Sequence, residues 1–173
     1  YDRLAADPLA PRQVAVAASQ VVRCGLWGAS SYKRSMRDQG LSLYLQFCAD
    51  YWGGSAEDEQ ILQAARRVTA AVPDFSFGWS ALALAAVPLS QSGRSEAAEL
   101  RKEALEAAER SIQLDRLNPE GYMAKAGLLP LSRFAEREAL LKRAIAVRPT
   151  ECGCERQSYG DFLTSVGRME DAV

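Results

Sequence analysis

Apolar residues recur at intervals of three and four positions along most of this chain, which is the spacing that places side chains on one face of an α-helix. The clearest stretch is residues 104–149, where the pattern predicts a helix up to Leu114, a tight turn, a second helix, a loop and a third helix stopped by Pro149. Asn118 and Pro119 fit the start of the second helix, because Asn can cap a helix and Pro has no N–H to donate. The pattern therefore predicts an all-α fold.

The same period predicts helices before and after this stretch. Near the N-terminus it predicts an amphipathic helix over residues 13–26, closed by Cys24 and Gly25. Residues 30–40 are polar and basic, and we interpret them as a linker or a short helix with solvated charges. The apolar face of the first of these helices carries Val14, Ala17, Ala18, Val21 and Val22. Further helices are expected over residues 41–52, 55–73, 77–87 and 95–114, and again after residue 155.

Pairs of such helices, with small alanines at helix contacts, an aromatic residue early in the first helix and a proline after the second, resemble the tetratricopeptide (TPR) repeat. Units of that family are roughly 34 residues long. Leu45, Trp79, Tyr122 and Arg156 occupy equivalent early positions, at separations of 34, 43 and 34 residues. The long middle interval coincides with the polar residues 90–95, where we place an insertion.

The resemblance implies an α-solenoid of antiparallel helix pairs that forms a right-handed superhelix. No pair can bury its apolar face alone, so neighbouring pairs must stack. The expected organisation is an N-terminal segment, residues 1–40, with one amphipathic helix and the basic linker, followed by repeats over residues 41–173. The repeat boundaries are placed at about 41–74, 75–117, 118–150 and a partial unit, 151–173.

In TPR proteins the first helices line a concave side that holds an extended peptide or a partner helix. Carried over residue by residue, the groove positions here are Gln46, Asp50, Ser80, Leu84, Met123, Gly127, Gln157 and Asp161. This set lacks the Lys, Arg and Asn clamp of TPR proteins that bind peptide carboxylates, so an acidic C-terminal peptide is not expected. A protein or peptide partner with mixed polar and apolar surface fits better. The alternative is that these residues are solvent-exposed side chains in a groove that binds no ligand.

The amino-acid composition argues against several classes of function. The chain has 173 residues, of which 48% are apolar and 25% charged, so it can bury a sizeable core. A net charge of −1 argues against a nucleic-acid surface in this region. Histidine is absent, which excludes His triads, His bases and His metal ligands. No apolar run reaches the roughly 18 residues of a membrane span. We expect no catalytic residues, no metal and no cofactor.

Four cysteines leave three interpretations open. Zinc binding is disfavoured because Cys152 and Cys154 form a CxC rather than a CxxC motif, and Cys24 and Cys48 stand singly on helices. A redox site at Cys152 and Cys154 is the second interpretation. The third is disulfides, joining Cys24 to Cys48 and Cys152 to Cys154. A Cys24–Cys48 bond would indicate an oxidising compartment such as a periplasm; alternatively, Cys48 is a small apolar core residue.

The N-terminal portion carries a second resemblance. Tyr1-Asp2-Arg3, a helix rich in Val and Ala, a basic linker and the repeat start at residues 43–46 are similar to the region after the small α/β module of membrane-anchored winged-helix transcription regulators and related adenylate cyclases. This resemblance implies the extracytoplasmic sensory or interaction part of a bacterial signalling protein, although a cytoplasmic location stays open. Because the chain begins without Met and ends where a second repeat helix should start, we interpret it as a fragment.

Three hypotheses for the function follow. The first is a non-enzymatic TPR scaffold that binds a protein or peptide, within a membrane-bound signalling or transcription regulator. The second is a thiol-based redox sensor in which Cys152 and Cys154 cycle and alter the last repeat. The third is a purely structural spacer. The oligomeric state is not predicted.

Overall fold

In a computed structural model of the protein, every regular element is a helix, over the residues that the structure describes: 10–35, 38–54, 56–93, 95–147 and 154–172. This confirms the prediction of an all-α fold. The α-helices are α2 (Ala10–Ser31), α3 (Gln39–Gly53), α4 (Asp58–Ala71), α5 (Ser76–Ser90), α6 (Ala97–Leu114), α7 (Pro119–Leu128), α8 (Phe134–Val147) and α9 (Cys154–Ser165). Two short 3₁₀ helices, η1 (Leu131–Arg133) and η2 (Met169–Ala172), complete them.

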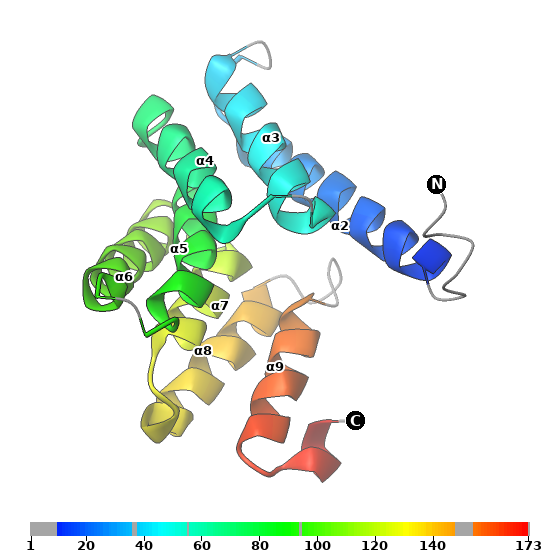
Figure 1. Cartoon of the computed structure of the whole chain (residues 1–173), viewed down its shortest axis with the longest axis vertical. Coiled ribbons are helices and arrows are strands. Elements are labelled where there is room, and N and C mark those ends of the chain that lie inside the picture. The colour runs from blue at the N-terminus through cyan, green and yellow to red at the C-terminus, as the bar shows by residue number, and fades with distance from the viewer. Residues whose placement is uncertain (1–9, 36–37, 55, 94, 148–153, 173) are drawn as a thin grey trace.

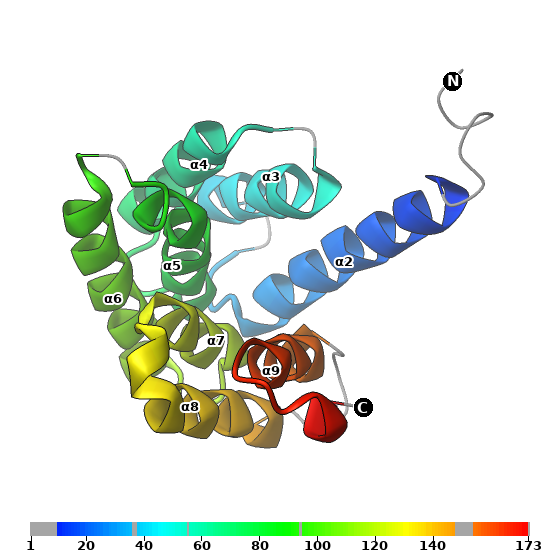
Figure 2. The ribbon, with the colours of Figure 1, turned by 60° about the horizontal axis from the view of Figure 1, so that its bottom comes forward.

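Each helix packs against the one that follows it, from α2 to α9, as Figure 1 shows. In addition, α5 contacts both α3 and α7, and α7 contacts α9. The helices α3, α5, α7 and α9 therefore lie in sequence along one side of the molecule. Figure 2 shows that the chain curves around this side and that the C-terminal end of α2 lies inside the curve, while its N-terminal end points away from it. We propose that α3–α4, α5–α6 and α7–α8 are the successive repeat units.

Side chains at the helix ends explain where two of the first helices begin. The Asn118 side chain accepts a hydrogen bond from the backbone N–H of Glu120 at 3.0 Å, and Pro119 is the first residue of α7, as predicted. Asp38 caps α3 in the same way by accepting from the Gly40 N–H at 2.7 Å. At its other end, α3 is followed by Gly54 in the left-handed region, with φ 67°, a conformation that glycine adopts without steric cost.

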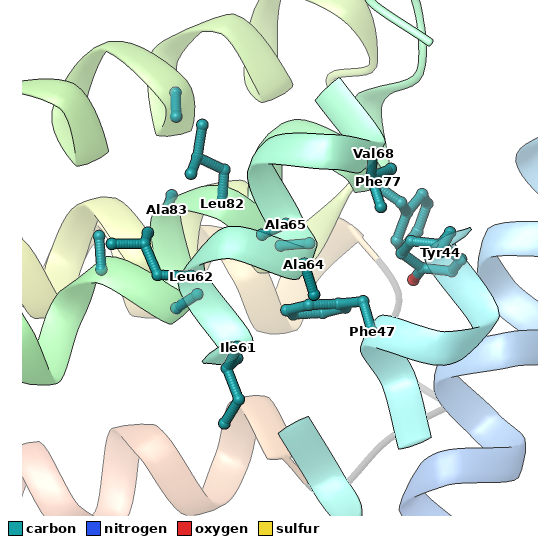
Figure 3. Packing of buried hydrophobic residues seen from close by; sticks show 14 of the residues in the cluster. Tyr44, Phe47, Ile61, Leu62, Ala64, Ala65, Val68, Phe77, Leu82 and Ala83 are labelled. Carbon is teal, nitrogen blue, oxygen red and sulfur yellow. The ribbon is translucent and has the colours of Figure 1, made fainter. Parts of the chain in front are cut away.

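The main core lies under α2 to α7 and is closed by aromatic side chains. Tyr44 and Phe77 are both 0% exposed, and Tyr44 meets Phe75 edge-on at 5.0 Å between ring centroids. Figure 3 shows Tyr44 and Phe77 beside each other under α4. The alanines expected at helix contacts are buried, which lets the helices approach closely. They include Ala65, Ala83, Ala86, Ala104, Ala108, Ala126 and Ala144.

The first helix differs from its prediction. It was expected over residues 13–26 with Gly25 as its end, but α2 runs from Ala10 to Ser31 and contains both Gly25 and Gly28. These glycines are contact points: a Cβ at Gly28 would lie 1.9 Å from the Tyr44 ring. The close packing that they permit offsets the lower helix propensity of glycine. By contrast, Val14 and Val22 on the predicted apolar face are 56% and 60% exposed.

Candidate functional site

The concave side holds a cavity of about 240 Å³. Its walls come from α3, α5, α7 and α9, which are the helices expected to line a groove, and from α2, which was not expected there. Beside it lies a second, wider hollow of about 680 Å³. The two share Leu84, Met123 and Asp161, so they form one continuous depression. We call this depression the groove and its smaller part the cavity.

Four of the predicted groove residues lie together in the cavity: Leu84, Met123, Gln157 and Asp161. Gly127 lines the second hollow. The structure therefore brings together the positions on α5, α7 and α9 at which the phase of the repeats placed the groove.

The other three predicted groove residues lie elsewhere. Ser80 is 0% exposed, and its hydroxyl donates to Glu120 Oε2 at 2.9 Å. Gln46 donates to Asp50 Oδ1 at 2.8 Å, and Asp50 lines a separate hollow between α3 and α4. On α3 the cavity is instead lined by Tyr51 and Trp52, which were not among the predicted groove residues.

Helix α2 contributes Gln20, Arg23 and Trp27 to the cavity. It is attached to α3 by a disulfide between Cys24 and Cys48, whose Cα atoms are 5.8 Å apart. The Tyr44 hydroxyl also donates to the Cys24 carbonyl oxygen at 3.3 Å. The cysteine pair was the one sequence signal that could place α2 beside α3.

The second cysteine pair falls partly outside the described residues. Cys154 is disulfide-bonded and lines the cavity. Its expected partner, Cys152, is not among the residues that the structure describes. The redox hypothesis for this pair stays a hypothesis.

Buried acidic residues dominate the electrostatics of the cavity. Glu120 is 8% exposed and Glu155 only 2% exposed, yet both line it. Burial, together with the charges of Glu120 and Asp58, raises the pKa of Tyr51 to about 12. Burial and Glu120 also raise the pKa of Tyr44 well above its usual value of 10. Both phenols are therefore neutral at physiological pH.

A buried polar network holds Glu120 in place. Its partner Ser80 lies 3.3 Å from Asn118 Nδ2, which also donates to Ser76 Oγ at 2.8 Å and to Ser111 Oγ at 3.1 Å. Because Asn118 Oδ1 caps α7 at the Glu120 N–H, one side chain fixes both the helix start and the carboxylate beside it. The Glu120 carboxylate is thereby preorganised at the cavity wall.

The second hollow has a different character. Apolar residues of α5, α7 and α8 form much of its wall, together with Arg101 and Arg137. The Arg137 guanidinium lies 5.5 Å from the Phe162 ring centroid, and burial lowers its pKa. Arg101 donates to the Ser90 carbonyl oxygen at 3.3 Å. The groove thus passes from an acidic and aromatic end to an apolar end with two arginines.

The described part of the chain contains neither a candidate metal site nor a candidate membrane-spanning helix. No three of its Cys, Asp or Glu side chains are grouped so that they could hold a metal ion. None of its helices combines the length and the apolar character needed to cross a membrane.

The fold resembles solved TPR structures, whereas the sequence matches no protein-family model and no curated protein. TTC0263, a thermophilic TPR protein in Thermus thermophilus, is 16% identical with a TM-score of 0.64, covering 94% of this chain and 85% of its own. MamA of AMB-1 is 18% identical with a TM-score of 0.49 over 94% and 90% of the two chains. MamA of MSR-1 is 18% identical with a TM-score of 0.47 over 94% and 87%. The likeness to TTC0263 shows that the chain has a TPR-like fold, an α-solenoid of helix pairs.

Proposed function

We propose that this chain is a non-enzymatic interaction domain that binds an extended segment of a partner protein along its groove. The observation that supports this most is the convergence of α2, α3, α5, α7 and α9 on one continuous depression. Solenoids bind partners on such concave surfaces. Aromatic, apolar, acidic and basic side chains line it, and this mixture suits a peptide of varied sequence better than a single small molecule.

Selection of peptides tests the proposal. A random 12-residue peptide library is selected against the full chain, and the dissociation constants of enriched peptides are measured by fluorescence anisotropy. Gln157→Trp places a large side chain in the cavity on α9, and Gln113→Trp makes the same change on the exposed face of α6. We expect Gln157→Trp to weaken binding at least about tenfold, which corresponds to roughly 1.4 kcal/mol.

Two results would contradict the proposal. One is that no peptide is enriched over an unrelated helical protein. The other is that enriched peptides bind both tryptophan variants equally, because the site would then lie outside the groove. The spacer hypothesis predicts the first of these results.

We further propose that the domain belongs to a bacterial signalling or transcription regulator and works in an oxidising compartment. The resemblance of the N-terminal portion to such regulators supports the first part. The disulfide between Cys24 and Cys48 supports the second, because reducing compartments keep thiols free. The flanking gene sequence tests the context: a winged helix and one membrane span upstream are expected, and an unrelated enzyme domain in their place would contradict it.

A redox sensor is the second candidate function, supported by the position of the disulfide-bonded Cys154 on the cavity wall. In this proposal a dithiol gives two electrons and two protons to the disulfide, which yields two protein thiols and an oxidised dithiol. Thiol counting by mass spectrometry, before and after a mild dithiol, tests it. If Cys152→Ser/Cys154→Ser binds selected peptides with the affinity of the reduced and of the oxidised wild type alike, the sensor is excluded.

A further inference from the structure

Two arginines reach the second hollow of the groove from α6 and α8. Among the described residues, α6 lines this hollow through Arg101 alone. The Arg101 guanidinium extends to the C-terminal end of α5, where it donates to the Ser90 carbonyl oxygen at 3.3 Å. The end of this side chain, rather than the helix that carries it, therefore lies beside the hollow.

Arg137 reaches the same hollow from α8. It precedes Leu141 by four positions, so the two residues lie on one face of that helix. Leu141 is 4% exposed and lies in the core that joins α7, α8 and α9. The Arg137 guanidinium carbon lies 5.5 Å from the ring centroid of Phe162, which lines the hollow from α9. The Arg137 side chain therefore points inward, between α8 and α9.

No carboxylate of the described residues forms an ion pair with Arg101 or Arg137. The Arg137 Nε is shielded from solvent and has no hydrogen-bond partner there. Burial lowers the pKa of Arg137, but a guanidinium stays charged at physiological pH. A charge kept from water is costly unless an opposite charge lies close to it. The hollow therefore favours an anionic ligand group.

The rest of the lining narrows the choice of anion. Its charged residues are two arginines and Asp161, which give a formal charge of +1, although the whole chain carries −1. Apolar side chains form much of the remaining wall, among them Leu84, Val87, Met123, Leu128 and Phe162. A bare inorganic anion would leave these apolar surfaces in contact with water, whereas a carboxylate with apolar neighbours covers them. A volume of about 680 Å³ accommodates such a group together with its neighbours.

We infer that the second hollow is a subsite for one Asp or Glu side chain of the bound peptide, with apolar residues on either side of it. This inference rests on the proposed peptide-binding function and adds the chemistry of the residues recognised. The carboxylate lies beside Arg101 and Arg137, and its apolar neighbours pack on α5 and α7. Both arginines lie on second helices of the proposed repeat units, so this site differs from the first-helix clamp for C-terminal carboxylates that the chain lacks.

The Nε–H group of Arg137 gives a direct measurement by NMR, because its shielding from water slows the exchange of its proton. The full chain labelled with ¹⁵N is titrated with Leu-Glu-Leu, Leu-Gln-Leu, Leu-Lys-Leu and Gly-Glu-Gly. All four peptides are acetylated and amidated, so none has a terminal carboxylate. We expect Leu-Glu-Leu to shift the Arg137 signal in a saturable way and Leu-Lys-Leu to have no effect. Leu-Gln-Leu and Gly-Glu-Gly should each bind at least about tenfold more weakly than Leu-Glu-Leu.

Two matched variants of α8 sharpen the test. Arg137→Gln removes the guanidinium that lines the hollow, and Arg143→Gln makes the same change at an exposed position of the same helix, beside the Tyr122 ring. Fluorescence anisotropy with labelled Leu-Glu-Leu measures the affinity, and circular dichroism checks the fold of each variant. We expect Arg137→Gln to raise the dissociation constant at least about tenfold and Arg143→Gln to leave it unchanged. Asp161→Asn removes the like charge from the lining and should lower the dissociation constant roughly two- to fivefold.

The inference is overturned if Leu-Glu-Leu and Leu-Gln-Leu bind equally, if neither shifts the Arg137 signal, or if Arg137→Gln and Arg143→Gln bind with the same affinity. Octanoate, a carboxylate on an apolar chain without a peptide backbone, is titrated in parallel. If it binds more tightly than Leu-Glu-Leu, the hollow is a site for a small amphipathic acid instead. These failures are distinguishable from failure of the peptide-binding proposal. Peptides selected from the random library would still bind the groove and be blocked by Gln157→Trp, but would show no enrichment of Asp or Glu.

Discussion

The two hydrophobic clusters of this protein are built in different ways. The larger one, under α2 to α7, is closed by aromatic rings that meet one another, such as Tyr44 with Phe75 at 5.0 Å. The smaller one joins α7, α8 and α9 through four buried residues, Ala126, Leu141, Phe162 and Leu163. Its two rings, Tyr159 and Phe162, stack at 6.4 Å and are in addition contacted by cations: Arg137 lies 5.5 Å from Phe162 and Lys142 lies 5.8 Å from Tyr159.

This difference bears on the groove, because its walls belong to both clusters. Helices α2, α3 and α5 are anchored in the larger cluster, and α9 only in the smaller one. In a solenoid, stability accrues between neighbouring pairs, so a helix with few buried contacts opens at a lower free energy than the rest. We therefore expect the α9 wall to be adjustable and the opposite wall to be rigid.

The largest expected effect comes from removing one buried ring in each cluster. Phe77 is 0% exposed, and Phe77→Ala should cost about 3–5 kcal/mol of unfolding free energy across the whole chain. Phe162 is 4% exposed, and Phe162→Ala should mainly release α9. Urea denaturation measures the first effect. Amide hydrogen exchange measures the second, as a loss of protection in α9 with α4 and α5 unchanged. Equal loss of protection in all helices for both variants would show that the clusters fold as one unit.

The disulfide is expected to have the next largest effect. Cys24 and Cys48 are separated by 24 residues, and closing a loop of this size stabilises a protein by about 3 kcal/mol. The double variant Cys24→Ser/Cys48→Ser should lower the urea midpoint accordingly and reduce the protection of α2 more than that of α9. A midpoint equal to that of the wild type would mean that burial alone holds α2 against α3.

Much of the fold could be predicted because its signals are local. The period of the apolar residues marks each helix, Asn118 and Pro119 mark the start of α7, and the buried alanines mark the contacts. The position of α2 could not be predicted in this way. Its valines suggested a buried face, but contact with α3 is made through Gly25 and Gly28, whose role depends on residues of the next helix.

The candidate site was predictable to the extent that it follows the phase of the repeats. Leu84, Met123, Gln157 and Asp161 lie in the cavity for that reason. Glu120 was missed because an acidic residue in the first turn of a helix is usually solvent-exposed and favoured there by the helix dipole. Its burial depends on Ser80, which is 40 positions earlier in the chain. Contacts at that distance leave no periodic signal.

Two glycine-to-alanine substitutions, with smaller expected effects of opposite sign on the unfolding free energy, test how closely α2 packs on α3. Gly28→Ala would bring a methyl group to 1.9 Å from the Tyr44 ring, and relieving that overlap should cost about 1–3 kcal/mol. Gly127→Ala would meet nothing closer than Val87 at 3.8 Å and should stabilise α7 by about 0.5–1 kcal/mol. Urea denaturation of both variants measures the difference. A neutral Gly28→Ala would contradict the close packing of α2 on α3.

The smallest expected effect concerns the ion pairs that fasten α9 and η2 to α8. Hydrogen bonds from Lys142, Tyr159 and Arg168 lower the pKa of Glu138 to about 2, from an ordinary value of 4.5. Since the folded-state pKa is the lower one, the stabilisation is complete above about pH 4.5 and is lost as the pH falls towards 2. The difference in α9 stability between the wild type and Glu138→Gln should therefore be constant near neutral pH and shrink through this window. Tyr159→Phe removes a hydrogen bond of 2.8 Å to Glu138. The folded-state pKa of Glu138 should then rise from about 2 towards its ordinary value, so that the stabilisation is lost at a higher pH than in the wild type. Thermal unfolding and hydrogen exchange of α9 at pH 7, 4 and 3 measure this. If the difference in α9 stability between the wild type and Glu138→Gln is the same at pH 3 as at pH 7, these exposed ion pairs do not stabilise α9.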